Sequence, residues 1–205
     1  QDMQELGSKG NMSVINAMSE SEHPTQAIAD LITIQEAFGS LHGRKIVYLG
    51  EGNNTAAALV NCVALIEGME LILLTPEGYG VDKNILTKGQ QKANGIGSKI
   101  IESHSMDDFP DYADVVYTTR WETMGVTHED PNWKDGFWPF KVTEEVMRKV
   151  STGEKTIFMH DLPAIREQDV ANSVLDGSQS VAFRQAYHKQ TAAMAVFEFV
   201  FQNKD

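Results

Sequence analysis

The stretch that decides the fold is Lys45-Ile46-Val47-Tyr48-Leu49-Gly50-Glu51-Gly52-Asn53-Asn54. Its first five residues, Lys45–Leu49, run apolar without the polar alternation of a half-exposed strand, which predicts a strand buried on both faces. Gly50 and Gly52 then predict a tight turn, and Asn53 is a favourable N-cap for a following helix. A buried strand, a tight turn and a helix form the repeating unit of a parallel α/β sheet.

The same alternation continues along the chain. We expect further strands at Glu70–Thr75, Ser98–Ile101, Asp114–Tyr117, Thr156–Met159 and Ser180–Phe183. We expect helices at His23–Phe38, Asn53–Glu67, Asp82–Asn94, Thr143–Val150 and Arg184–Phe201. This order predicts one α/β domain over residues 1–205: a three-layer, doubly wound, mainly parallel, Rossmann-like sheet with helices on both faces. The stretch Glu122–Phe140 is expected to be a long irregular loop, functional or mobile.

The amino-acid composition disfavours several classes of protein. The 205 residues are 41% hydrophobic, with 17 Lys and Arg against 29 Asp and Glu, which gives a net charge of −12. Such a charge disfavours nucleic acid as a partner. The single cysteine, Cys62, can form no internal disulfide, and a reducing, cytoplasmic location is expected. No apolar run reaches the roughly 18 residues of a membrane span. Gln1 is neither an initiator Met nor the start of a leader, so a longer natural protein is expected.

Candidate ligand-binding residues follow the predicted strands, because open α/β sheets bind ligands beyond the carboxyl ends of their strands. His160-Asp161 is either an acid/base pair or part of a polar loop. Arg120 either grips a carboxylate or is solvated or paired with Glu122. The turn Gly50–Asn54 resembles a dinucleotide fingerprint weakly, since Thr55 replaces the third glycine; a tight turn and an amide pair for a polar ligand are the other interpretations.

Two further candidates open the first long helix. His23 precedes Pro24, so it stands at the N-cap, where the helix dipole disfavours the imidazolium form. A neutral His23 can donate one hydrogen bond to a carbonyl oxygen, although a histidine at a cap is more often structural. Gln26 lies one turn further and could bind an amide. The sequence carries no motif of a nucleophilic hydrolase, a zinc enzyme or a P-loop, and we expect neither a metal nor a cofactor.

Taken in order, several motifs resemble the aspartate/ornithine carbamoyltransferase family. The residues are Val14–Asn16, Glu22-His23-Pro24-Thr25-Gln26, Ala29–Glu36, Gly50–Asn54, Asp114–Thr118, Thr123-Met124-Gly125, His160-Asp161-Leu162-Pro163-Ala164 and Ser178–Val181. The resemblance runs from about residue 11 to the end. It is to the C-terminal, amino-acid-binding half of that family, nearer to the ornithine type but with altered substrate loops.

The resemblance implies transfer of a carbamoyl group from carbamoyl phosphate to an amine of an amino acid. By similarity, His23 would donate to the carbamoyl carbonyl oxygen and Gln26 would accept from the carbamoyl NH2. The main-chain carbonyl of Leu162 would hold the same NH2. Asn54 and the Thr123-Met124 loop would bind the amino acid. Positioning and preorganised electrostatics would supply the catalysis.

This chain departs from the family's pattern at several positions. Thr119 stands where ornithine enzymes carry the Asp that holds the substrate's α-amino group, and Thr123 stands for a Ser. Arg120 matches the Arg with which aspartate enzymes grip a carboxylate. Asp161 replaces a Cys, and would attract a cationic amine or act as its base if burial raises its pKa. Lys189 replaces an Arg that faces carbamoyl phosphate in the family. The ammonium group of a lysine is a point charge, whereas the guanidinium group of an arginine can donate two parallel hydrogen bonds.

The resemblance also sets expectations for the whole protein. The carbamoyl-phosphate-binding half, with its S-x-R-T-R motif, is expected to be missing here, so this fragment alone is expected to be inactive. The intact protein is expected to be a homotrimer with active sites between subunits. The substitutions at Thr119, Asp161 and Lys189 leave an alternative, an inactive paralogue that binds an amino acid or a partner protein. A nicotinamide-binding module remains a third interpretation.

Overall fold

The computed structural model describes residues 2–10, 12–122, 129–151 and 155–202. The strands are β1 (Lys45–Leu49), β2 (Glu70–Leu74), β3 (Lys99–Ser103), β4 (Val115–Thr118) and β5 (Ile157–His160). The α-helices are α1 (Asp2–Lys9), α2 (Pro24–Phe38), α3 (Asn54–Val63), α4 (Lys83–Gly95), α5 (Glu144–Val150), α6 (Asn172–Leu175) and α7 (Ala182–Gln202). Three short 3-10 helices are η1 (Met106–Asp108), η2 (Trp133–Gly136) and η3 (Trp138–Phe140).

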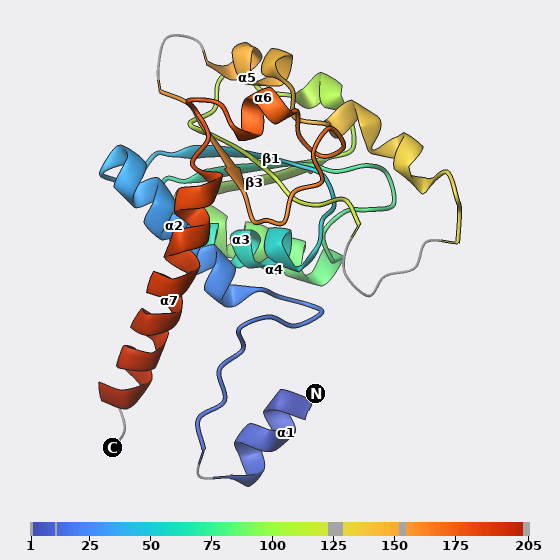
Figure 1. Cartoon of the computed structure of the whole chain (residues 1–205). Coiled ribbons are helices and arrows are strands. Elements are labelled where there is room, and N and C mark those ends of the chain that lie inside the picture. Colours follow the sequence, from blue (N-terminus) through green and yellow to red (C-terminus); the bar gives the residue numbers. More distant parts are fainter. Residues whose placement is uncertain (1, 11, 123–128, 152–154, 203–205) are drawn as a thin grey trace.

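The five strands form one parallel sheet in the order β3-β2-β1-β4-β5. Both faces of the sheet are covered. Ile46 and Tyr48 of β1 pack in one core with α2, α3 and α4, whereas Val47 and Leu49 pack in a second core with α5 and α6. Figure 1 shows the sheet between α2, α3 and α4 on one side and α5 and α6 on the other. The prediction of a three-layer, doubly wound α/β fold is confirmed.

The helix ends follow local chemistry. Pro24 begins α2, and Gly39 ends it in the left-handed conformation with φ 75°. The Asn53 side chain accepts hydrogen bonds from the N–H groups of Thr55 and Ala56, and the Thr143 hydroxyl accepts from Val146 N. The helix starts predicted from these residues lie within one residue of those observed.

One predicted strand is wrong. Ser180–Phe183 contributes only an isolated bridge between Ser180 and Phe158, and α7 begins at Ala182. Gln185 N already donates to Val181 O at 2.8 Å, so the chain winds into the helix directly after the bridge. A four-residue apolar run cannot distinguish a strand from the buried start of a helix. Within the described ranges, no helix is long and apolar enough to span a membrane.

Candidate functional site

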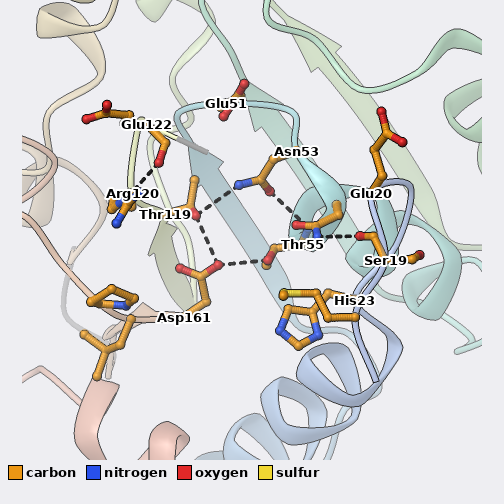
Figure 2. A pocket seen from close by; sticks show the side chains of 14 residues that line it. Ser19, Glu20, His23, Glu51, Asn53, Thr55, Thr119, Arg120, Glu122 and Asp161 are labelled. Atoms are coloured by element: carbon orange, nitrogen blue, oxygen red, sulfur yellow. Dashed lines mark hydrogen bonds between the residues drawn. The ribbon is translucent and has the colours of Figure 1, made fainter. Parts of the chain in front are cut away.

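The chain order places a switch point between β1 and β4. After β1 the chain adds β2 and β3 on one side, then returns to place β4 and β5 on the other. Ligands of open α/β sheets bind at such a point, outside the carboxyl ends of the strands. A pocket of about 540 Å³ lies there. Its lining, drawn in Figure 2, is Met18, Ser19, Glu20, His23, Glu51, Asn53, Asn54, Thr55, Thr119, Arg120, Glu122, Asp161, Leu162 and Pro163.

The turn after β1 is shaped by its glycines. Gly50 has φ 124°, and a Cβ on Gly52 would lie 2.2 Å from Val81 N, so only glycine fits there. Gly52 N donates to Tyr79 O at 2.7 Å. Both glycines are therefore explained by backbone conformation and packing, which favours the tight-turn interpretation of Gly50–Asn54 over a dinucleotide fingerprint.

A chain of hydrogen bonds joins the three strand ends around Asp161 (Figure 2). Asp161 Oδ2 accepts from Thr55 Oγ1 at 2.8 Å and from Thr119 Oγ1 at 3.0 Å. Asn53 Nδ2 lies 3.2 Å from the Thr119 hydroxyl oxygen, to which it donates. Residues after β1 and β4 thus hold one carboxylate oxygen of Asp161, which follows β5 and lines the pocket.

His160 does not pair with Asp161. The ring of His160 is fully buried; its Nε2 lies 2.7 Å from Asp169 Oδ2, and its Nδ1 accepts from Leu162 N at 2.8 Å. Nδ1 therefore carries a lone pair, so the 3.4 Å approach of Asp161 Oδ1 to it brings two acceptors together and is no hydrogen bond. His160 orders the loop after β5, and Asp161 alone faces the pocket.

His23 is the N-cap residue of α2, and its side chain makes no cap bond. Its Nδ1 lies 2.7 Å from the carbonyl oxygen of Ala17, and its main-chain N–H donates to Asn54 O at 3.2 Å. Burial lowers the pKa of His23 and nearby Lys189 adds to this, although the Ala17 bond and Asp161 act in the opposite direction. The neutral ring is therefore favoured, as the helix position predicts.

Gln26 is 1% exposed, lies one turn beyond His23 and is not among the residues that line the pocket. Its Nε2 donates to Asp30 Oδ1 at 2.7 Å. Its Oε1 is buried and has no hydrogen-bond partner in the described part of the chain. A buried acceptor without a donor is costly, so this oxygen is suited to take a donor from a ligand.

The other predicted residues divide into three groups. Asn54, Thr119, Arg120 and Leu162 line the pocket; Asn54 Nδ2 donates to Ser19 O at 2.8 Å and Arg120 Nε to Glu122 O at 2.7 Å. Lys189 does not line it, because its ammonium donates to the main-chain oxygen of Asp161. Thr123 and Met124 lie outside the described residues.

Several lining residues escaped the sequence reasoning. They are Met18, Ser19, Glu20, Glu51, Thr55 and Pro163. Thr55 could have been found from its place one turn after the β1 glycines, whereas Met18 to Glu20 lie in a loop without a recognisable pattern. Among the described residues, no three His, Cys, Asp or Glu side chains gather as a metal site.

Comparison with known families shows which family this chain belongs to. Residues 42–200 match the model described as "Aspartate/ornithine carbamoyltransferase, Asp/Orn binding domain". The chain belongs to the aspartate/ornithine carbamoyltransferase family. Residues 1–36 match the family's carbamoyl-P binding domain, so His23 and Gln26 fall within that stretch, and Asp161 falls within the Asp/Orn domain.

The relatives that this chain matches are longer than it is. A protein named ornithine carbamoyltransferase from Oceanobacillus iheyensis is 39% identical over 196 residues, which span 96% of this chain and 60% of that protein. The namesake from Methanobrevibacter smithii is 37% identical, over 95% of this chain and 64% of its own length. The solved ornithine carbamoyltransferase from Pyrococcus furiosus has a TM-score of 0.90 at 33% identity, over 100% of this chain and 64% of that one.

Proposed function

We propose that this chain contributes to the transfer of a carbamoyl group from carbamoyl phosphate to an amine of an amino acid, and supplies the acceptor-binding half. The observation that carries the proposal is that His23 and Asp161, 138 positions apart and in stretches matching different family domains, line one pocket. The amine nitrogen attacks the carbonyl carbon, a C–N bond forms, the C–O bond to phosphate breaks, and the amine loses a proton.

The carbamoyl group is proposed to lie between α2 and the loop after β5. The unpaired Oε1 of Gln26 is suited to accept from the carbamoyl NH2, and the main-chain carbonyl of Leu162 is proposed as a second acceptor. Fixed acceptors of this kind orient the planar group before attack, which lowers the entropic barrier.

The tautomer of His23 limits what its second ring nitrogen can do. A carbonyl oxygen only accepts, so the contact with Ala17 requires a hydrogen on Nδ1. Neutral His23 then presents Nε2 as an acceptor. We propose that Nε2 takes the proton of the incoming amine, and that the resulting imidazolium donates to the carbamoyl oxygen as negative charge develops there.

The pocket's charge favours a cationic acceptor. Its lining carries the carboxylates of Glu20, Glu51, Glu122 and Asp161 against the single guanidinium of Arg120. We propose that Asp161 Oδ1, which points away from its Thr55 and Thr119 donors, binds the acceptor's ammonium group. Ornithine fits this charge; Arg120 and Thr119 are proposed to bind the acceptor's remaining polar groups.

The alternative is a non-catalytic paralogue that binds an amino acid or a partner protein. The contact that favours it is the hydrogen bond of Lys189 to the main chain of Asp161, because an ammonium held there is drawn away from a phosphate. A measurement of enzymatic turnover distinguishes the enzyme from the non-catalytic paralogue. The full-length protein is incubated with carbamoyl phosphate and a panel of L-ornithine, L-lysine, L-aspartate and putrescine, and ureido products are measured.

Product with at least one cationic amine, and its loss in His23→Ala, is the expected result. Binding of an amine by calorimetry without any product would support the paralogue. We further propose that the intact protein is cytoplasmic and trimeric, which analytical ultracentrifugation and cell fractionation would test.

A further inference from the structure

A buried polar cluster lies beneath the pocket and contains a carboxyl group that the proposed reaction does not use. Asp30 of α2 is fully buried. Its Oδ1 accepts from Gln26 Nε2 at 2.7 Å and from Gln185 Nε2 at 2.7 Å, and its Oδ2 accepts from the Tyr117 hydroxyl at 3.0 Å. Gln26, Gln185 and Tyr117 are almost wholly buried as well, so these groups depend on one another for hydrogen bonds.

This geometry fixes which way the amide of Gln26 points. If the amide were flipped, Gln26 Oε1 would face Asp30 Oδ1, and two acceptors would meet without a hydrogen between them. The N–H group of Gln185 already lies on the same oxygen and supplies no replacement donor for Oε1. Gln26 is therefore held with Nε2 toward Asp30, and its Oε1 stays unpaired.

The orientation does not depend on whether Asp30 is ionised. Burial raises the pKa of Asp30 to about 7, although its three hydrogen bonds oppose that effect. Because Oδ1 already accepts two N–H groups, a proton on this carboxyl belongs on Oδ2, beside the Tyr117 hydroxyl. Oδ1 remains an acceptor for Gln26 in both forms.

The cluster also ties Gln26 to the strand end that carries Asp161. Gln185 Oε1 accepts from His160 N at 2.9 Å, one residue before Asp161. Asp30 and Gln26 belong to α2, Tyr117 to β4 and Gln185 to α7, and α2 lies beside α7 in Figure 1. One carboxyl group therefore connects the stretch that matches the carbamoyl-P domain to the stretch that matches the Asp/Orn domain.

We propose that Asp30 is a positioning residue, whose Oδ1 holds Gln26 so that its carbonyl oxygen meets the NH2 of a bound carbamoyl group. This inference rests on the proposed function. It predicts a specific selectivity: the site prefers a ligand with NH2 on its carbonyl carbon over the same ligand with CH3, because only NH2 satisfies the buried oxygen. Asp30 supplies that selectivity without touching the ligand.

A matched pair of stable ligands tests the proposal. Phosphonoacetamide and 2-oxopropylphosphonate share the phosphonate and the carbonyl, and differ only in NH2 against CH3. Their dissociation constants are measured by calorimetry on the full-length protein. We expect the wild type to prefer the amide by about tenfold, the worth of a buried hydrogen bond with an otherwise unpaired acceptor.

Two variants separate positioning from charge. Asp30→Leu removes the acceptor at similar volume and is expected to abolish the preference. Asp30→Asn keeps one oxygen for Gln26 and Gln185 and turns its NH2 toward the Tyr117 oxygen, so it is expected to retain the preference. A merely structural role would weaken both ligands equally. An Asp30→Leu protein that still prefers the amide overturns the inference.

A measurement on the wild type covers the case in which Asp30→Leu fails to fold. The side-chain NH2 of Gln26, assigned by 15N NMR, is expected to be protected from solvent exchange before any ligand is added. An NH2 that exchanges freely contradicts the inference. If the wild type binds neither phosphonate and turns over no amine, the proposed function itself has failed; a wild-type preference that survives in Asp30→Leu refutes only the role of Asp30.

Discussion

The Nδ1 atom of His23 lies 2.7 Å from the carbonyl oxygen of Ala17. Thr25 Oγ1 donates to the same oxygen at 2.8 Å, so Ala17 anchors the first turn of α2 at two points. Because the carbonyl can only accept, Nδ1 carries the hydrogen of the neutral ring, and the other nitrogen, Nε2, has none while His23 is neutral. The donor role implied by family resemblance therefore requires a protonated ring.

The tautomer and the protonation state of His23 can be measured by NMR. Burial lowers the pKa of His23 below its usual value of 6.5. We expect imidazole 15N shifts to report the Nδ1–H tautomer at neutral pH, and the midpoint of titration to lie under 6.5. His42 provides an internal reference for the tautomer, because its Nδ1 lies 3.0 Å from Glu67 O. An Nε2–H tautomer in His23 would contradict the Ala17 contact.

Asp161→Asn tests the cation-binding role of the pocket. The amide still offers an oxygen to Thr55 and Thr119, so the fold should persist. Loss of the charge is expected to weaken a cationic acceptor by about 10- to 100-fold in KM, the range for hydrogen bonds to charged groups. Steady-state kinetics with L-ornithine measure it. The matched control is Asp111→Asn, an exposed residue that precedes β4 and therefore lies at the amino ends of the strands, away from Asp161 at their carboxyl ends. Equal KM values in both variants would refute the role.

Gly52→Ala tests the turn that shapes the pocket floor. The added methyl would meet the Val81 backbone nitrogen at 2.2 Å, so the backbone must shift. We expect a loss of about 1–3 kcal/mol in the free energy of unfolding. Gly95→Ala is the control, since a Cβ there meets nothing within 4 Å. That change should be neutral or slightly stabilising, because alanine favours the helical state. Chemical denaturation of both variants measures these changes in the free energy of unfolding.

The raised pKa of Asp30 predicts that the free energy of unfolding depends on pH. Its pKa is about 7 in the folded protein and 3.8 in the reference state. Between these values the folded state binds more protons than the unfolded state, so stability falls as pH rises. We expect the wild type to lose up to a few kcal/mol relative to Asp30→Asn between about pH 4 and pH 8. Urea denaturation of both proteins across this range measures the difference. A constant difference would show that Asp30 titrates normally.

The sheet was predictable because most of its strands are continuous apolar runs. Each of β1 to β5 lies within two residues of its predicted position. In β1, β2, β4 and β5, burial on both faces leaves no polar alternation to blur the pattern, whereas the edge strand β3 buries only Ile100. The short helices α1 and α6 were missed. Eight and four residues carry too few turns for a periodic signal, and α1 buries none of its residues.

The pocket was predictable in outline, because the strand ends of a parallel sheet converge. Asn54, Thr119 and Asp161 were expected there and line the pocket together. The bonding pattern was not predictable. Asp30 lies one helical turn after Gln26, a spacing that sequence reveals, but its bond with Gln185 joins residues 155 positions apart. Such pairings depend on how α2 and α7 pack, which no local pattern encodes.

The attachment of α2 bears on how the two family domains can move. Asp30 bonds α2 to Gln185, Glu36 bonds it to Arg184, and Asn54 holds the preceding loop at Ser19. We therefore expect α2 to move together with the Asp/Orn domain, although its sequence matches the other domain. We expect any hinge between the two domains to lie before Ala17, ahead of the boundary that the sequence matches give.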